Sequence, residues 1–317
     1  MCTIVVRPNG AVVYGRPCRR FWTVSRMTQH FDFSPAALAE LAQADVARAL
    51  AEDVGQGDLT AALVDPALRA QARVVARESA VVCGQAWVQA AILALDPQAH
   101  ITWHVGDGGH CTPDQTVFEV QGRAQALLTA ERTALNFLQL LSAVATKTAT
   151  YVAAVAGTRA AIVDTRKTLP GLRLAQNYAV RCGGGTNHRI GLFGAVLIKE
   201  NHIAAAGGIA PVLAQAAPVA AHAEFVEIEV ETLDQLREAL ACGARMVLLD
   251  NMPLPTLHEA VRINAASPTP AILEISGGVT LSGLRALAET GVDRISIGTL
   301  TKDIQAIDYS MRFAPQP

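Results

Sequence analysis

Apolar runs and helical patterns alternate through the second half of the chain. Beyond Gly157, six short apolar runs end in polar residues or glycine, at 160–167, 194–202, 224–231, 245–251, 271–278 and 294–299. Amphipathic stretches separate the runs, and strands that alternate with helices imply βαβ units and a parallel sheet. Because the runs are largely continuous in their apolar character, we expect both faces of this sheet to be covered.

The first half of the chain mixes helical and strand patterns. Ser34-Pro35 opens an amphipathic helix over 34–53, and residues 87–96 form a second helical pattern. A longer helical stretch over 129–157 has Thr129 as its expected N-cap. From about residue 28 to about residue 140, the pattern therefore predicts an α+β domain.

Two segments of this first half predict strands. Residues 71–84 alternate like a strand pair that turns at Arg77–Ser79, and residues 101–125 predict a meander with a hairpin turn at VGDGGH (105–110). With 317 residues the chain is long enough for two domains, and the second has the pattern of a β/α barrel.

The ends of the six predicted strands carry chemically distinctive residues. In order along the chain these are Asp164, Arg166 and Lys167, then Lys199, Glu229, Asp250, then Ser276, Gly277 and Gly278, and finally Gly298. In β/α barrels the carboxyl ends of the strands meet at one edge, where the active site lies. Cations come early, carboxylates in the middle and glycines late; late glycines suit a phosphate site in the loops after the last strands. Rim ion pairing is the structural alternative for Glu229 and Asp250.

Unpaired positive charge is concentrated in one window. The chain has 26 basic and 28 acidic residues, yet no acid occurs between Asp164 and Glu200. That window holds six arginines and lysines and one histidine: Arg166, Lys167, Arg173, Arg181, His188, Arg189 and Lys199. An ordinary surface mixes both signs, so a run of one sign indicates an anionic partner.

Composition narrows the kind of anion. A formal net charge of -2 argues against a nucleic-acid-binding protein, and no apolar run reaches the ~18 residues of a membrane helix. The six cysteines form no CxxC pair, which fits a reducing cytoplasmic location. The spacing of histidine and cysteine in 100–111 matches no common zinc pattern. A small anion held in a pocket is the remaining prediction.

The first residues stand apart. No acid occurs before Asp32, although five arginines do. This weakly resembles a mitochondrial presequence, but Pro8, Gly10, Gly15 and Pro17 interrupt any amphipathic helix. The preferred interpretation is a non-structural extension over 1–27, with Met27 as the functional start.

Several stretches together resemble the quinolinate phosphoribosyltransferase family. They are EDVGQGDLT, TAERTALNFLQLLSAVAT, DTRKT, GGGTNHR, LIKENH, EIEVET, LLDN, EISGGV and ISIGTLT, in the family's order from about residue 29 to the C-terminus. The resemblance implies an α/β fold with an N-terminal α/β sandwich domain (28–142), joined by the tail (300–317), and an incomplete, open β/α barrel (143–299). It also implies a homodimer in which Arg132 reaches into the neighbour's site.

By the same resemblance, the reaction joins quinolinate to phosphoribosyl pyrophosphate with Mg²⁺ as cofactor, giving nicotinate mononucleotide, pyrophosphate and CO₂. Matching positions assign to quinolinate Arg132, Arg166, Lys167, His188, Arg189 and Lys199. Glu229 and Asp250 match carboxylates near the ribose and the metal, which they would hold through water. Ser276, Gly277, Gly278 and Gly298 match the 5′-phosphate cradle. Lys167, Lys199, Glu229 and Asp250 are the expected catalytic residues, and which lysine stabilises the decarboxylation carbanion stays open.

Three other interpretations remain at this point. A relative could take nicotinate or serve a molybdenum-related operon, although a monocarboxylate needs fewer cations. Lys199 at a strand end could be the Schiff-base lysine of a barrel aldolase. A non-catalytic binding protein is the third.

Overall fold

The computed structural model describes residues 4–6, 12–14 and 32–314. The predicted extension over 1–27 falls almost entirely outside them. A short antiparallel pair, β1 (Ile4–Val6) and β2 (Val12–Tyr14), is its only described part.

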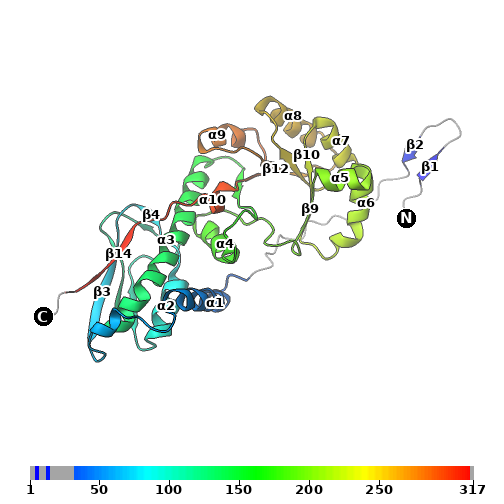
Figure 1. Cartoon of the computed structure of the whole chain (residues 1–317). Helices are drawn as coiled ribbons and strands as arrows, with labels where there is room; N and C mark the ends of the chain where they lie inside the picture. The colour runs from blue at the N-terminus through cyan, green and yellow to red at the C-terminus, as the bar shows by residue number, and fades with distance from the viewer. Residues whose placement is uncertain (1–3, 7–11, 15–31, 315–317) are drawn as a thin grey trace.

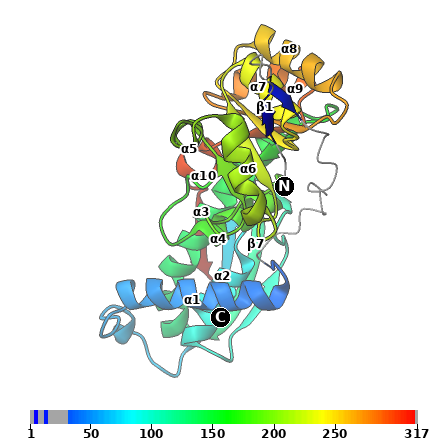
Figure 2. The same ribbon diagram turned by 90° about the vertical axis from the view of Figure 1, so that its right-hand side faces the viewer.

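An antiparallel sheet with helices forms the first part of the chain. Its strand order is β14 (Tyr309–Phe313), β3 (Arg69–Ala76), β7 (Thr116–Arg123) and β5 (His100–Trp103). The helices of this part are α1 (Pro35–Asp53), α2 (Gln85–Leu95) and the first half of α3 (Ala124–Ala154), with a 3-10 turn, η1 (Ala61–Leu63). Figure 2 shows α1 lying across this part, at the opposite end of the molecule from α7, α8 and α9.

A six-stranded parallel sheet forms the second part, and all six predicted strands are confirmed. They are β8 (Ala161–Val163), β9 (Val196–Ile198), β10 (Val226–Val230), β11 (Met246–Asp250), β12 (Ile272–Ser276) and β13 (Arg294–Ser296). The order β8-β13-β12-β11-β10-β9 is that of an α/β barrel left open between β8 and β9. The predicted α/β class is therefore confirmed (Figure 1).

A helix follows each strand; the helices after β9, β10, β11 and β12 cover the outside of the open barrel, whereas the helix after β8 packs against α3 (Figure 1). The helices are α4 (Arg173–Cys182), α5 (Glu200–Ala206), α6 (Ile209–Ala220), α7 (Leu233–Ala241), α8 (Leu254–Ala265), α9 (Leu281–Glu289) and α10 (Thr299–Lys302). Among the described residues no single helix is long and apolar enough to cross a membrane; only α5 and α6 taken together, bent by 99° at their junction, reach that length and composition.

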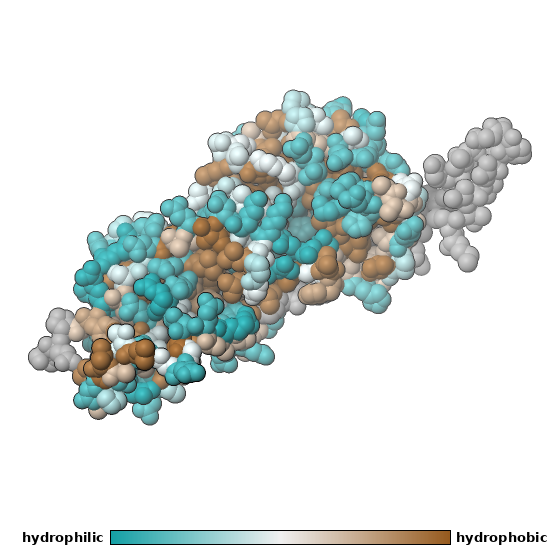
Figure 3. All heavy atoms as spheres, viewed as in Figure 1, coloured by the Kyte–Doolittle hydropathy of each residue, from teal (hydrophilic) through white to brown (hydrophobic). Residues whose placement is uncertain are grey.

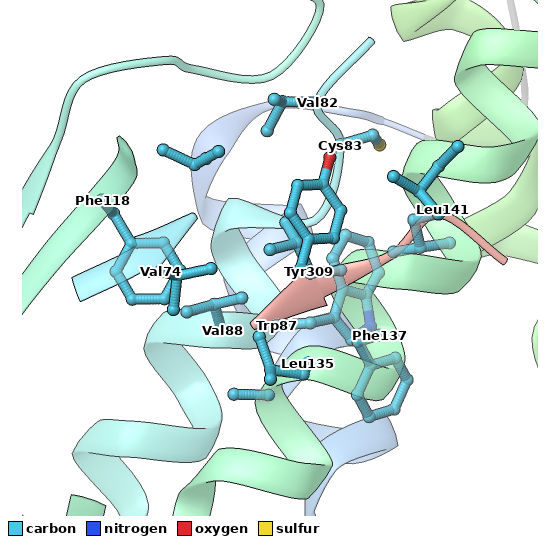
Figure 4. Packing of buried hydrophobic residues seen from close by; sticks show 14 of the residues in the cluster. Val74, Val82, Cys83, Trp87, Val88, Phe118, Leu135, Phe137, Leu141 and Tyr309 are labelled. Atoms are coloured by element: carbon cyan, nitrogen blue, oxygen red, sulfur yellow. The ribbon is translucent and has the colours of Figure 1, made fainter. Parts of the chain in front are cut away.

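Two continuous elements tie the parts together. Helix α3 starts in the first part and reaches β8 and α9 of the second, so it runs through the proposed domain boundary at 142 and 143 without interruption. That boundary stays a prediction. The C-terminal strand β14 returns to pair with β3 in antiparallel register from Tyr309↔Ala76 to Phe313↔Ala72. Figure 4 shows Tyr309 packed into the hydrophobic core of the first part of the chain, among Trp87, Phe118 and Leu135.

The helix starts show one success and one error of the sequence patterns. Ser34 caps α1 as expected, since its Oγ accepts a hydrogen bond from Ala37 N–H at 3.5 Å. The long helix begins at Ala124, after Arg123, and Thr129 is not its N-cap. The Thr129 hydroxyl instead donates to Asp58 Oδ2 at 2.9 Å, so a good capping residue lies inside the helix because it holds the loop after α1.

Two predicted strand pairings are wrong for a common reason. Strand β3 pairs with β7 and β14, whereas β4 (Ala80–Val81) pairs with β6 (His110–Cys111) in a separate small sheet. The segment 105–110 does turn, but it joins β5 to β6, which belong to different sheets. Local turn residues fix where a chain reverses and leave the partner strands to tertiary packing.

Candidate active site

The carboxyl ends of the six parallel strands form one edge of the open barrel, called the mouth here. Glu229 pairs with Leu248, and Asp250, two residues further along its strand, pairs with Ser276, while Lys199 follows Ile198, the partner of Ile228. Because residues two apart on a strand share a face, the side chains of Lys199, Glu229, Asp250 and Ser276 lie on one face of the sheet at this edge. On the face seen in Figure 3, hydrophilic residues surround a hollow in the middle of the molecule. The sequence-predicted strand-end residues are thus brought together from separate βα loops.

The buried carboxylate of Asp164 holds the backbone of the segment that carries His188 and Arg189. It is 1% exposed, and its carboxylate accepts hydrogen bonds from Asn177 Nδ2 at 2.5 Å, Asn187 Nδ2 at 2.6 Å and the backbone N–H of His188 at 2.8 Å. Burial raises the pKa of Asp164 to about 6, although these three donors lower it. Asp164 therefore shapes the loop and does not face a ligand.

Arg166 and Arg189 place two guanidinium groups near each other. Burial, with the charge of Arg166 added, lowers the pKa of Arg189. Arg189 Nη1 donates to Ala195 O at 3.1 Å, which fixes its direction, whereas Arg166 Nε is buried with no hydrogen-bond partner among the described residues. Two like charges held together, one with an unused donor, are an arrangement that an anion would stabilise.

Lys167 links the first and last strands of the barrel. A Cβ added to Gly298 would lie 2.8 Å from Lys167 Cδ, so glycine lets this side chain pass the end of β13. The carbonyl of Lys167 accepts a hydrogen bond from Thr301 Oγ1 at 2.8 Å, and Gln176 Nε2 donates to Thr301 O at 2.9 Å. The Lys167 side chain therefore lies beside Gly298, one of the glycines expected at the phosphate site.

Lys199 and Glu229 form the shortest ion pair at the mouth. Lys199 Nζ lies 2.6 Å from Glu229 Oε2, with the lysine side chain 45% exposed and the glutamate side chain 9% exposed. Burial raises the pKa of Glu229, Lys199 lowers it, and Asp250 raises it further. Asp250 is thus close enough to act on Glu229, because it lies on the neighbouring strand two residues beyond Leu248, the partner of Glu229. The rim ion pairing considered as an alternative for Glu229 does occur, and it lies within the mouth.

His188 does not face the mouth in the expected way. Its Nε2 lies 2.9 Å from Glu227 Oε2, and its Nδ1 accepts the backbone N–H of Arg189 at 2.8 Å. Both ring nitrogens are therefore used by the protein. Burial alone would lower the pKa of His188, but Glu274 and Glu227 outweigh burial and raise it.

The glycines after β12 form a tight loop against a residue that the sequence reading missed. Asn251 has a left-handed backbone (φ 52°), and its N–H donates to Ser276 O at 3.0 Å. Gly277 and Gly278 have φ of 91° and 57°, and a Cβ on Gly277 would lie 3.1 Å from Asn251 N. Non-glycine residues disfavour such angles, so the loop keeps its backbone open at the mouth.

Three buried charges were also missed. Glu227 and Glu274 are fully buried, and Arg294 Nε donates to Glu274 Oε2 at 2.7 Å. Together with His188 they form a polar floor beneath the mouth. The signal was present, because charged residues in the middle of apolar parallel strands are rare unless they are paired.

The remaining cations of the window lie apart or have local roles. Arg173 donates to Thr168 Oγ1 at 3.1 Å and to Ile190 O at 3.2 Å, and Arg181 lies over the ring of Phe33 at 5.4 Å. Arg132 is exposed on α3 and forms no hydrogen bond or ion pair with the mouth within the described chain. Among the predicted side chains, Lys199, Glu229 and Asp250 lie together, Arg166 lies near Arg189, and His188 points to buried carboxylates instead.

Comparison with known proteins agrees with this geometry. The model for the N-terminal domain of quinolinate phosphoribosyl transferase matches residues 58–142, and the C-terminal domain model matches residues 144–312. The carboxylating nicotinate-nucleotide pyrophosphorylase of Mycobacterium leprae is 40% identical over 279 residues, covering 86% of this chain and 97% of that protein.

Solved structures give the same result. The nicotinate-nucleotide pyrophosphorylase from Francisella tularensis is 43% identical with a TM-score of 0.83, over 87% of this chain and 97% of that one. The enzyme of that name from Ehrlichia chaffeensis is 33% identical with a TM-score of 0.81, over 90% of this chain and 100% of that one. Fold and site define a two-part, open-barrel phosphoribosyltransferase. The chain belongs to the quinolinate phosphoribosyltransferase family.

Proposed function

We propose that this chain is a carboxylating nicotinate-nucleotide pyrophosphorylase of de novo NAD biosynthesis, which converts quinolinate and phosphoribosyl pyrophosphate to nicotinate mononucleotide, pyrophosphate and CO₂. The observation that carries the proposal is the pair of half-buried guanidinium groups of Arg166 and Arg189 at the mouth, beside the Lys199–Glu229 pair. A dianionic pyridine would offset both guanidinium charges at once.

The residues divide into three roles. Arg166, Lys167, Arg189 and Lys199 bind the two carboxylates of quinolinate, and His188 acts through Arg189. The loop of Ser276, Gly277 and Gly278, together with Gly298, offers backbone N–H groups to the 5′-phosphate. Glu229 and Asp250 face the ribose, where their negative charge stabilises the positive charge that develops at C1 as pyrophosphate leaves.

Decarboxylation follows from the same arrangement. The pyridine nitrogen carries no proton, so its attack on C1 needs no general base. Once the nitrogen is quaternary, the ring accepts the electron pair released when the adjacent carboxylate leaves as CO₂. Lys167 and Lys199 are the two ammonium groups able to stabilise the carbanion at carbon 2 until it is protonated.

The protein supplies only some of the ligands that a Mg²⁺ ion needs. Asp250 offers a carboxylate with no ion pair among the described residues, whereas one oxygen of Glu229 is occupied by Lys199. Two carboxylates without further protein ligands suit Mg²⁺, which keeps several waters and takes substrate phosphates as ligands. Bound there, Mg²⁺ would neutralise charge on the pyrophosphate group.

We also propose that the active unit is a homodimer. Arg132 matches a family position that reaches the neighbouring site, and its exposed place on α3 leaves it available for this. The proposed location is the cytoplasm, and the four described cysteines are free thiols, as a reducing compartment requires.

Product analysis tests the function. Quinolinate labelled in the 2-carboxylate, incubated with phosphoribosyl pyrophosphate and Mg²⁺, is expected to release labelled CO₂ and pyrophosphate in equal amounts. Replacing quinolinate by nicotinate should abolish turnover; equal turnover would assign the chain to a nicotinate-specific relative. The aldolase alternative is disfavoured because an ammonium group paired with a carboxylate at 2.6 Å is a poor amine nucleophile.

A further inference from the structure

A second cluster of ligand-type side chains lies outside the mouth. One ligand atom each from Cys83, Asp107 and Cys182 lies within 4.8 Å of the other two. Cys83 precedes α2, Asp107 lies between β5 and β6, and Cys182 is the last residue of α4. Three segments far apart in the sequence thus converge on one point between the two parts of the molecule. The catalytic proposal uses none of the three residues.

Hydrogen bonds fix the backbone and carboxylate that carry two of these groups. Cys83 N–H donates to Ser142 Oγ at 3.0 Å, and the Ser142 hydroxyl donates to Cys83 O at 3.3 Å. Asp107 Oδ1 accepts from the N–H groups of Gly84 at 2.9 Å and Gln85 at 3.1 Å. Both groups are therefore held in place before any ligand binds.

The third group is fixed by the close approach of α4 to α3. A Cβ on Gly183, directly after Cys182, would lie 2.3 Å from Ala145 O, so only glycine fits there. On the other side, Tyr178 OH donates to Asp107 Oδ2 at 2.9 Å and joins α4 to the Asp107 loop. Cys182 is thus presented to Cys83 and Asp107 by packing that a larger residue at 183 would disrupt.

The cluster concentrates acidic groups without a cation. Cys83 is fully buried, Cys182 and Asp107 are half-buried, and none of the described Lys, Arg or His side chains forms an ion pair with Asp107. Burial raises the pKa of the Cys83 thiol, and Cys182 and Asp107 raise it further. Burial also raises the pKa of Asp107. Two thiols and a carboxyl group therefore converge within ligand distance of one another, and a divalent ion bound among them would favour the thiolate and carboxylate forms.

We propose that Cys83, Asp107 and Cys182 form a binding site for a thiolate-seeking divalent ion of the zinc class. Zinc accepts sulfur and carboxylate ligands in tetrahedral geometry, and three protein ligands leave one position for water. Two thiolates disfavour Mg²⁺ and Ca²⁺, which take oxygen ligands. Each thiol gives up its proton to solvent as the metal–sulfur bond forms.

The site would act as a clamp between the two parts of the chain. Cys182 directly precedes segment 183–189, which carries His188 and Arg189, while Cys83 and Asp107 belong to the first part. A bound ion would hold the start of this segment against α2. This site does not depend on the proposed reaction, and its test needs no catalytic activity.

Cobalt substitution tests the site directly. Full-length protein carrying Cys2→Ser and Cys18→Ser, reduced and freed of metal by chelation, is titrated with Co²⁺ and then Zn²⁺. We expect one equivalent of Co²⁺ with a thiolate-to-cobalt charge-transfer band, which Zn²⁺ abolishes. The band distinguishes this site from the other described three-ligand group, His188, Glu227 and Glu274, which has no sulfur.

Variants separate the site from non-specific thiol binding. Cys83→Ser and Cys182→Ser should each lose the band, Asp107→Asn should weaken binding at least tenfold, and Cys242→Ser, an exposed cysteine outside the cluster, should behave like the parent. Circular dichroism checks folding, and Cys83→Ala provides a second variant. Absence of a stoichiometric band in the reduced parent would overturn the proposal. So would an unchanged band in a folded Cys83→Ser or Cys182→Ser variant, or formation of a Cys83–Cys182 disulfide in protein whose reduced form binds no metal.

Discussion

His188 accepts the backbone N–H of Arg189 at Nδ1, 2.8 Å away, while its Nε2 lies 2.9 Å from Glu227 Oε2. A neutral imidazole that accepts at Nδ1 carries its proton on Nε2 and donates it to Glu227. No ring nitrogen is then left for a substrate. The imidazole instead connects the buried floor of the barrel to the backbone of a cation at the mouth.

Two amide substitutions separate the two bonds of His188. His188→Asn keeps an acceptor near Nδ1, whereas His188→Gln keeps a donor near Nε2. We expect His188→Gln to raise the KM for quinolinate by about tenfold, as loss of one hydrogen bond of about 1 kcal/mol or slightly more implies. His188→Asn should keep a KM near that of the parent and lose about 1–3 kcal/mol of stability, because Glu227 stays buried without its donor. Equal KM effects in two folded variants would show that His188 touches the substrate itself.

Removing Lys199 should affect binding more than folding. The Lys199 side chain is 45% exposed, so Lys199→Ala should change the free energy of unfolding by about 1 kcal/mol or less. Loss of a charge-assisted hydrogen bond should weaken quinolinate at least ~10-fold, measured by calorimetry. Lys147→Ala is the matched control, because Lys147 forms a comparable ion pair, with Asp303 at 2.8 Å, and is not one of the expected site residues. An equal loss of stability and binding in Lys199→Ala would argue for a purely structural lysine.

Neighbouring glycines provide a graded test of the phosphate loop. Gly277→Ala adds strain at φ 91° and a Cβ 3.1 Å from Asn251 N, whereas a Cβ on Gly278 would meet only Asn251 Oδ1, at 3.9 Å. We expect Gly277→Ala to cost ~1–3 kcal/mol of stability and to raise the KM for phosphoribosyl pyrophosphate, and Gly278→Ala to do less of both. The KM for quinolinate should stay near that of the parent. If only the KM for quinolinate changed, the 5′-phosphate would have to bind away from this loop.

Mixed subunits test the shared site. Arg132→Ala and Lys199→Ala homodimers should each be inactive. If each site takes Arg132 from one subunit and Lys199 from the other, random mixing makes half of the molecules heterodimers. Each heterodimer has one intact site, so about a quarter of the parental activity should return. Mixtures that stay inactive after verified subunit exchange would contradict the shared site.

Asp164 predicts a definite pH dependence of stability. Its pKa is raised from 3.8 to about 6 in the fold, so the folded state binds the proton more tightly than the unfolded state. The stability contribution is full below about pH 4 and is lost as the pH rises through about 6, by up to ~3 kcal/mol. The difference between the parent and Asp164→Asn, measured by urea unfolding from pH 4 to pH 7, isolates this group. If the difference in the free energy of unfolding between the two proteins did not change with pH, the pKa of Asp164 would not be raised in the fold.

The six parallel strands were predictable because burial on both faces leaves a continuous apolar run that ends at a polar residue. The strand-end side chains followed from the same rule. Glu227 could be expected to be paired from its place in an apolar strand, but its pairing with His188 was not predictable, because the direction of a side chain depends on what it meets across the barrel. The prediction that Thr129 caps a helix was wrong for a similar reason, since its hydroxyl donates a hydrogen bond to Asp58 from inside the helix. The partners of β3 and β4 depend on long-range packing that turn residues do not encode.

Comparative binding of two pyridines tests the central claim most directly. The account holds that the cations at the mouth exist for a dianion, so calorimetric titration should give quinolinate at least ~10-fold tighter than nicotinate, the value of one charge-assisted hydrogen bond. The ratio of the two affinities should fall in Arg166→Gln, because the buried Nε of Arg166 has no hydrogen-bond partner among the described residues and is removed by the substitution. Equal affinities for the dicarboxylate and the monocarboxylate in the parent protein would contradict it.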